Sequence, residues 1–175
     1  MDIFVEQIIK KQYDFKDFLI IFGSILIGFL LIGLCLMFLP FALIPILICA
    51  VALAYYLITS RNIEFEYSIT NGDITIDKII NKSRRKRIIS IDAHDIEFMG
   101  KNKPTNIKNN YIRLNVSQSQ NNESNWYFSG HNSQKGNVFV LFTPNDKVLS
   151  AIKPFLSRQV AIDAFGRNWF SRNKQ

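Results

Sequence analysis

Charge is absent from one long stretch of the sequence. From Phe18 to Ser60 there is no Asp, Glu, Lys, Arg or His, so all 35 formal charges lie elsewhere. A bilayer core about 30 Å thick needs roughly 20 apolar residues per spanning helix, so this stretch is too long for one helix and suits two. It is also far longer than the apolar part of a signal peptide, which has about 7–15 residues. We therefore predict a membrane protein.

Pro40 lies near the middle of this stretch and predicts a turn there. The expected transmembrane hairpin covers 18–58, with helices at about 18–38 and 41–58. An even number of spans places both ends of the chain on the same side of the membrane.

Basic residues indicate which side that is. Lys10, Lys11 and Lys16 precede the first helix and Arg61 follows the second, whereas the connection has neither Lys nor Arg. Short cytoplasmic segments carry an excess of Lys and Arg. We expect a multi-pass protein of the cell (plasma) membrane with both termini in the cytoplasm.

Cysteine and the usual signatures of catalysis are missing from the rest of the chain. Cys35 and Cys49 both lie in the apolar stretch, so the remainder has neither a disulfide framework nor a cysteine zinc site. The only histidines are His94 and His131, and there is no Gly-x-Ser-x-Gly elbow or Gly-rich phosphate loop. We predict no catalytic residues, no bound metal and no cofactor.

The positive charge is concentrated after the apolar stretch. Residues 61–175 carry 18 Lys and Arg against 10 Asp and Glu, whereas residues 1–17 are slightly acidic. A basic surface attracts nucleic acid, anionic lipid or an acidic partner. Membrane attachment favours lipid, and the aromatic residues follow an alternating pattern typical of a core, so no nucleic acid is expected.

From Asn62 onward the apolar periodicity is that of strands. Alternation and turn signals such as Asn71-Gly72 predict seven short strands, with Ile96 and Phe98 facing inward in the fourth. Three loops are predicted, over 100–110, 117–125 and 129–137, and the one over 117–125 is expected to be exposed. A helix follows, capped by Asn145 and bent at Pro154. The predicted strands cover 63–70, 73–80, 84–91, 94–98, 111–116, 126–128 and 138–142.

This order of elements resembles a known group of proteins. Two apolar helices precede Phe65-Glu66-Tyr67, Thr70-Asn71-Gly72, Ile76-Asp77-Lys78-Ile79 and Arg84-Arg85-Lys86-Arg87. The arrangement looks like that of small bacterial membrane proteins with a cytoplasmic pleckstrin-homology-like (PH-like) domain. The resemblance implies a barrel of about seven antiparallel strands with a C-terminal helix over 61–157, and it implies no catalytic residues.

The cytoplasmic N-terminal segment, 1–17, mixes apolar and charged residues. Two interpretations remain open for it. It forms a short helix on the membrane surface, or it is a plain helical lead-in to the first span.

The strongest candidate contact is a basic run, in which five cations occupy six positions. In a strand, these side chains would make both faces positive. Such a cluster attracts anionic headgroups or an acidic partner; the alternative is a solvated edge strand protected by charge. The residues are Lys82, Arg84, Arg85, Lys86 and Arg87.

A second candidate is the basic amphipathic tail over 158–175. Aromatic and basic residues alternate there, which suits a segment lying among the headgroups. Equally, the segment packs back on the domain or pairs with another chain. The proposed interfacial residues are Arg158, Phe165, Arg167, Trp169 and Arg172.

The sequence thus predicts a non-enzymatic adaptor at the cytoplasmic face, which binds anionic lipid or an unknown protein partner. The partner would engage an exposed sheet edge or the groove beside the helix. One alternative is an accessory subunit of a larger membrane complex, such as a transporter or envelope-stress assembly, held through the hairpin. A less favoured one is a lipid-modifying enzyme that uses His94 and nearby carboxylates.

Overall fold

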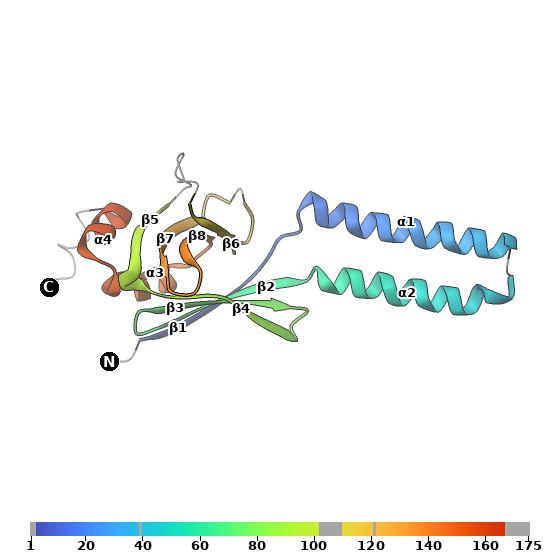
Figure 1. Ribbon diagram of the computed structural model, residues 1–175, viewed down its shortest axis with the longest axis horizontal. Coiled ribbons are helices and arrows are strands. Elements are labelled where there is room, and N and C mark those ends of the chain that lie inside the picture. Colours follow the sequence, from blue (N-terminus) through green and yellow to red (C-terminus); the bar gives the residue numbers. More distant parts are fainter. Residues whose placement is uncertain (1–2, 39, 102–109, 121, 167–175) are drawn as a thin grey trace.

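A computed structural model describes residues 3–38, 40–101, 110–120 and 122–166. It shows a long helical hairpin that projects from one end of a small two-sheet domain (Figure 1). Helix α1 is Phe15–Phe38, the 3-10 turn η1 is Pro40–Ala42, and α2 is Leu43–Ser60. Both helices are long and apolar enough to cross a membrane. The predicted pair of apolar helices with a turn at Pro40 is confirmed.

Sheet A is an antiparallel sheet in the order β1-β2-β3-β4. Its strands β2 and β3 have the bounds predicted from alternation, and the Asn71-Gly72 turn between them has positive φ at both residues, 49° and 99°. Apolar side chains such as Tyr67 and Ile76 enter the core from one face, and the other face carries charged side chains together with Phe4 and Ile8. The strands are β1, Phe4–Lys10; β2, Ile63–Thr70; β3, Asp73–Ile80; and β4, Arg84–Asp92.

Strand β1 corrects the interpretation of the N-terminal segment. Residues 4–10 form neither a surface helix nor a helical lead-in, but an edge strand that pairs antiparallel with β2, from Phe4 opposite Thr70 to Lys10 opposite Glu64. The apolar residues Val5 and Ile9 pack against the core. The whole helical hairpin is therefore inserted between two neighbouring strands, and the domain begins before the first helix.

Sheet B differs from the prediction in direction and in closure. Its order is β5-β7-β8-β6, and β6 runs parallel to β8, whereas the other pairs are antiparallel. The described residues thus form two open sheets of four strands, not one barrel of seven antiparallel strands. Alternation within a strand does not reveal the direction of its partner, which explains the error. The strands are β5, Ile96–Lys101; β6, Ile112–Asn115; β7, Trp126–Asn132; and β8, Gly136–Phe142.

The core lies between the two sheets, and three short helical segments close it. Asn145 caps α3 by accepting the N–H of Val148, as predicted. Pro154 lies in η3, where the helical chain changes from α to 3-10 geometry. The segments are α3, Asp146–Ile152; η3, Lys153–Phe155; and α4, Arg158–Phe165.

Strand β5 begins later than predicted and turns one aromatic side chain outward. The 3-10 turn η2, Ala93–Asp95, precedes it. The register shifts between Ile96 and Phe98, so Met99 is buried while Phe98 remains 62% exposed. Phe98 was expected to face inward, and a register shift of this kind cannot be seen in the alternation of a short strand.

Candidate functional site

The basic run lies at the end of sheet A that adjoins the helices. Its turn is formed by Asn81 and Lys82, both with positive φ, 49° and 55°. The N–H of Asn81 donates to the carbonyl of Asn62, 2.8 Å away, two residues after α2 ends. In Figure 1 the β3–β4 turn accordingly lies on the same side of the domain as the helical hairpin.

Two of the five cations are engaged within the protein. Arg85 lies 2.5 Å from a carboxylate oxygen of Glu66, and Arg87 lies 3.3 Å from one of Asp77. Both carboxylates are on the outer face of sheet A, directly opposite each other. Their side chains are only 6% and 9% exposed. The arginines neutralise a pair of buried like charges, so this face is not simply positive.

Burial dominates the electrostatics of Glu66. It raises the pKa of the carboxyl group, and the charges of Glu6 and Asp77 add to this effect, whereas Arg85 opposes it. Removing Arg85 would leave a desolvated carboxylate beside Asp77, and such an unpaired charge destabilises a fold strongly. Arg85 therefore has a structural role whether or not it touches a ligand.

The other three cations face solvent. Lys82 is in the turn, and Arg84 and Lys86 are on the face of β4 opposite to that of Arg85. Among the residues that the structure describes, none of these three forms an ion pair. We call these three residues the free basic cluster. Of the five residues in the predicted contact, two are therefore paired with carboxylates and three are not, and the contact itself stays a prediction.

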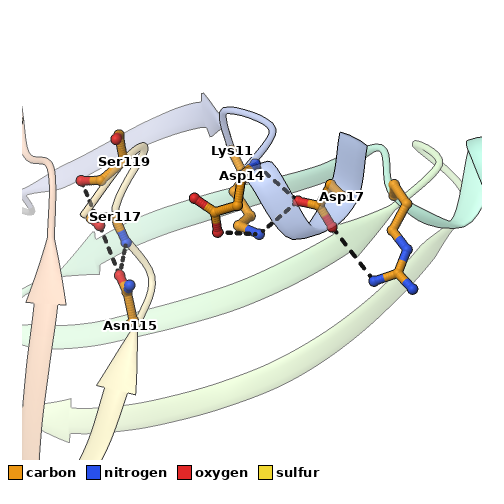
Figure 2. Close-up of polar contacts among 7 residues, drawn as sticks. Lys11, Asp14, Asp17, Asn115, Ser117 and Ser119 are labelled. Atoms are coloured by element: carbon orange, nitrogen blue, oxygen red, sulfur yellow. Dashed lines mark hydrogen bonds and ion pairs between the residues drawn. The ribbon is translucent and has the colours of Figure 1, made fainter. Parts of the chain in front are cut away.

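A compact ionic joint holds the helices to the domain (Figure 2). One carboxylate oxygen of Asp17, at the start of α1, accepts from Lys11 and from the backbone N–H of Asp14, both at 3.2 Å. Its other oxygen lies 3.5 Å from Arg61, which follows α2. Hydrogen bonds to Asp17 and Asp14 raise the pKa of Lys11 although burial acts to lower it. The entry of one helix and the exit of the other are thereby tied together.

The neighbouring loop, which was predicted to be exposed, is buried at its two ends, whereas Gln120, Glu123 and Ser124 between them are exposed. Asn125 is 5% and Ser117 4% exposed. Thr143 donates to the side-chain oxygen of Asn125, 2.8 Å, and accepts from the N–H of Gln118, 3.0 Å. Tyr67 of sheet A donates to the carbonyl of residue 116 and accepts from the N–H of residue 143. Polar residues of this loop were interpreted as solvated, but they satisfy one another inside the domain.

The loop also contacts the chain just before the helices. The N–H of Gln12 donates to the carbonyl of Gln118, 2.8 Å away. Figure 2 shows Ser117 and Ser119 of this loop, and Asn115 at the end of β6, beside the ionic joint. The segment that enters α1 is therefore fixed on both sides.

The start of the tail packs on the domain. Helix α4 lies at the end of the domain away from the helical hairpin (Figure 1). Phe165 stacks on Trp126 with ring centres 5.2 Å apart, and the Lys153 ammonium lies 4.2 Å from the centre of the Phe165 ring. Arg158 is exposed at the first turn of α4. This placement favours the alternative in which the segment packs back; Arg167, Trp169 and Arg172 lie outside the described residues.

An open groove of about 310 Å³ separates β5 from α4. Residues 97–101 form one wall, and Val160, Asp163 and Ala164 form the other. This is the groove beside the helix that the sequence interpretation named as a docking surface for a partner. It is on the side of the domain that α4 covers, away from the free basic cluster.

The histidines have local partners. His94 donates its backbone N–H to Asp92, 2.8 Å away, and its ring nitrogen lies at the same distance from that oxygen. These bonds lower the pKa of Asp92. His131 pairs with Asn137 in the neighbouring strand. Over the described ranges there is no group of three His, Cys, Asp or Glu side chains suited to a metal ion.

Comparison with known proteins gives a single match. A family model described as a bacterial PH-like domain (DUF6106) matches residues 1–162. No curated protein and no solved structure matches the chain. The matched range includes β1 and both helices, so the family model treats the hairpin and the two sheets as one unit.

Proposed function

The chain belongs to the bacterial PH-like domain family, and from that premise we propose that it is a non-enzymatic adaptor anchored in the membrane. The helical hairpin crosses the bilayer, the domain lies against the cytoplasmic face, and the free basic cluster contacts anionic headgroups. A protein partner then docks on the domain surface that faces the cytoplasm.

The observation that carries this proposal is the insertion of the hairpin between β1 and β2. The N–H of Lys11 still bonds to the carbonyl of residue 63, 2.9 Å away, so pairing continues to the base of the helices. No flexible linker separates membrane segment and domain. A domain attached in this way keeps a fixed orientation, which suits a docking platform better than a tethered module that must search for its ligand.

The fixed orientation also explains how a small cluster can contact lipid. Lys82 lies in a turn that is hydrogen-bonded to residue 62, at the base of α2, and Arg84 follows this turn. Each basic residue near an anionic surface contributes about 1 kcal/mol. Three cations held at the headgroups would therefore stabilise the domain's placement by about 3 kcal/mol.

The test uses the intact protein in nanodiscs of zwitterionic lipid, with or without phosphatidylglycerol. Anionic lipid should slow amide hydrogen exchange over 81–87, and high salt should reverse the effect because it screens exposed charges. The double variant Arg84→Glu/Lys86→Glu should lose the response. A variant of equal charge change elsewhere on the surface, Lys147→Glu/Arg158→Glu, should keep it. An exchange pattern independent of lipid charge would refute the headgroup contact.

Orientation needs a separate measurement. Of two reporters fused to the C-terminus, one that is active only in the cytoplasm should be active, and one that is active only on the other side of the membrane should be inactive. This follows from the cations at the base of the hairpin, Lys11 and Arg61, and from the absence of Lys and Arg from its far turn. A reporter that is active on the other side of the membrane would overturn the proposed topology.

A further inference from the structure

The two edge strands of sheet A, β4 and β1, differ in whether their outward backbone groups are available to pair with another strand. Along β4, Lys135 donates to the carbonyl of Ile88 and Asn132 to that of Ser90, both at 2.6 Å. Its remaining length carries the basic run. Capping side chains and charge both prevent another strand from pairing with an edge. Strand β4 is therefore closed to strand addition.

Strand β1 is open. Its odd-numbered residues bond to β2, as shown by the bonds from Lys11 to residue 63 and from Asn71 to Ile3. In an antiparallel pair the residues between them direct their N–H and C=O groups away from the partner. Those residues are Phe4, Glu6, Ile8 and Lys10, and no hydrogen bond from the part of the chain that the structure describes reaches these groups.

The edge lacks two of the devices that block pairing, and its charges are limited to Glu6 and Lys10. Strand β1 has no proline and no register shift against β2 over its seven residues. Gln7 fixes it to the start of α3 through bonds to the carbonyl of Thr143 and the N–H of Asn145. The edge is thus held straight and in place.

Its outward side chains define what would fit beside them. Phe4 is 64% and Ile8 55% exposed, which is unusual for large apolar residues of this domain. Glu6 stands between them and close enough to Glu66 to disfavour its charge. The acidic outer face around Glu6 is complementary to a basic side chain.

We propose that β1 docks an extended segment of a partner protein, which adds antiparallel to sheet A and places a basic residue opposite Glu6, between apolar residues opposite Phe4 and Ile8. Backbone hydrogen bonds would supply affinity and the three side chains specificity. This inference rests on the proposed adaptor function and names the chemistry of its partner.

A second copy of this chain does not fit the same edge. Strand β1 runs directly into α1, so every copy in one bilayer has its β1 strands pointing toward the membrane. Antiparallel pairing of two β1 strands needs a two-fold axis perpendicular to them, which would send the two helical hairpins in opposite directions. The occupant is therefore a different chain.

The experiment selects peptides on the intact protein in nanodiscs. The probe is a displayed library of nine-residue peptides in which every second position is randomised. Counter-selection uses Ile8→Pro, which removes an outward N–H but none of the bonds to β2. Retained peptides should carry Lys or Arg flanked two positions away by apolar residues, and should slow exchange of the Glu6 and Ile8 amides.

Two variants decide the outcome. Ile8→Pro should weaken binding of a selected peptide at least tenfold, and Glu6→Lys should weaken it severalfold while improving binding of the same peptide with its basic residue changed to Glu. Thermal unfolding checks that both variants remain folded. Peptides that bind all three proteins equally, that lack the basic position, or that leave β1 exchange unchanged would overturn the inference. The response of residues 81–87 to lipid should survive in Ile8→Pro, so the two proposals fail separately.

Discussion

The two sheets of the domain each have four strands, but different interactions hold them. Sheet A is a regular antiparallel series whose outer face carries arginine–carboxylate pairs on a solvent-facing surface. Sheet B combines a parallel pair with a close backbone approach at Gly130 and a buried polar network around Thr143. The stability of sheet A should therefore be most sensitive to the loss of a whole strand, and that of sheet B to substitutions that add or remove a few atoms.

The largest expected effect comes from removing β1 from sheet A. Residues 61–175 alone lack this strand and expose the edge of β2 and part of the core. We therefore expect this fragment to aggregate and to show no cooperative unfolding transition. Replacing residues 13–61 by a short Gly/Ser linker keeps β1 paired with β2 and should give a folded protein that is soluble without detergent. Circular dichroism and size-exclusion chromatography compare them; equal folding of both would show that β1 is dispensable.

Gly130→Ala should have the next largest effect, within sheet B. An added Cβ would lie 2.5 Å from the carbonyl oxygen of Asp95, a backbone atom that cannot turn away. Overpacking of this kind costs about 3 kcal/mol. At Gly136, where φ is +74° and the space is open, alanine should cost only about 1 kcal/mol through backbone strain. Chemical denaturation measures both, and similar costs would contradict the close approach.

Thr143→Val tests the polar network that joins the sheets. The change leaves the side-chain oxygen of Asn125 and the N–H of Gln118 without their hydrogen-bond partner, which costs about 2 kcal/mol of unfolding free energy. The same change at Thr75, whose hydroxyl bonds to Ser90 on the solvent side of sheet A, should cost under about 0.5 kcal/mol. If Thr75→Val proves the costlier of the two, the contrast between the sheets is wrong.

The smallest expected effect is a pH dependence beside sheet B. Burial lowers the pKa of Lys153 from 10.5 to about 8. Between these values the unfolded chain holds a proton that the folded protein lacks, so stability rises with pH in that window. Because the Phe165 ring partly offsets the burial cost, Lys153→Met should stabilise the domain by on the order of 1 kcal/mol below pH 8.

The control for this prediction is the pH profile itself. The advantage of the methionine variant should shrink as the pH rises from 8 to 10.5, because wild-type Lys153 is then neutral in the folded protein while the unfolded chain still holds its proton. A constant difference between the two proteins from pH 7 to 10.5 would show that Lys153 keeps its proton on folding.

Several features could be predicted because they depend on neighbouring residues. The two apolar helices, the turn at Pro40, strands β2 and β3 and the Asn145 cap all have local signals. The PH-like family was predicted from the order of these elements. Strand β1 was missed because Phe4 and Ile8 place apolar residues on both of its faces, which hides the alternation.

The candidate site was predicted only in part. The basic run was found as a run of charge, but its division into paired and free cations was not. Glu66 and Asp77 are separated from Arg85 and Arg87 along the chain and come close to them only when the strands pair. No local sequence pattern therefore links the carboxylates to the arginines. The polar loop at 117–125 was misjudged for the same reason, since Asn125 and Gln118 bond to the side chain of Thr143, which follows β8 and whose own N–H bonds to Tyr67 in sheet A.

By itself, the sequence determined that forty-three uncharged residues form two apolar helices and that the residues after them form β-strands, because hydrophobicity and its period act over a few residues. Only the tertiary structure decided that the hairpin is inserted within a sheet, which cations remain free and which edge stays open. Those properties depend on which strands become neighbours, and strand pairing joins residues that the chain itself keeps far apart.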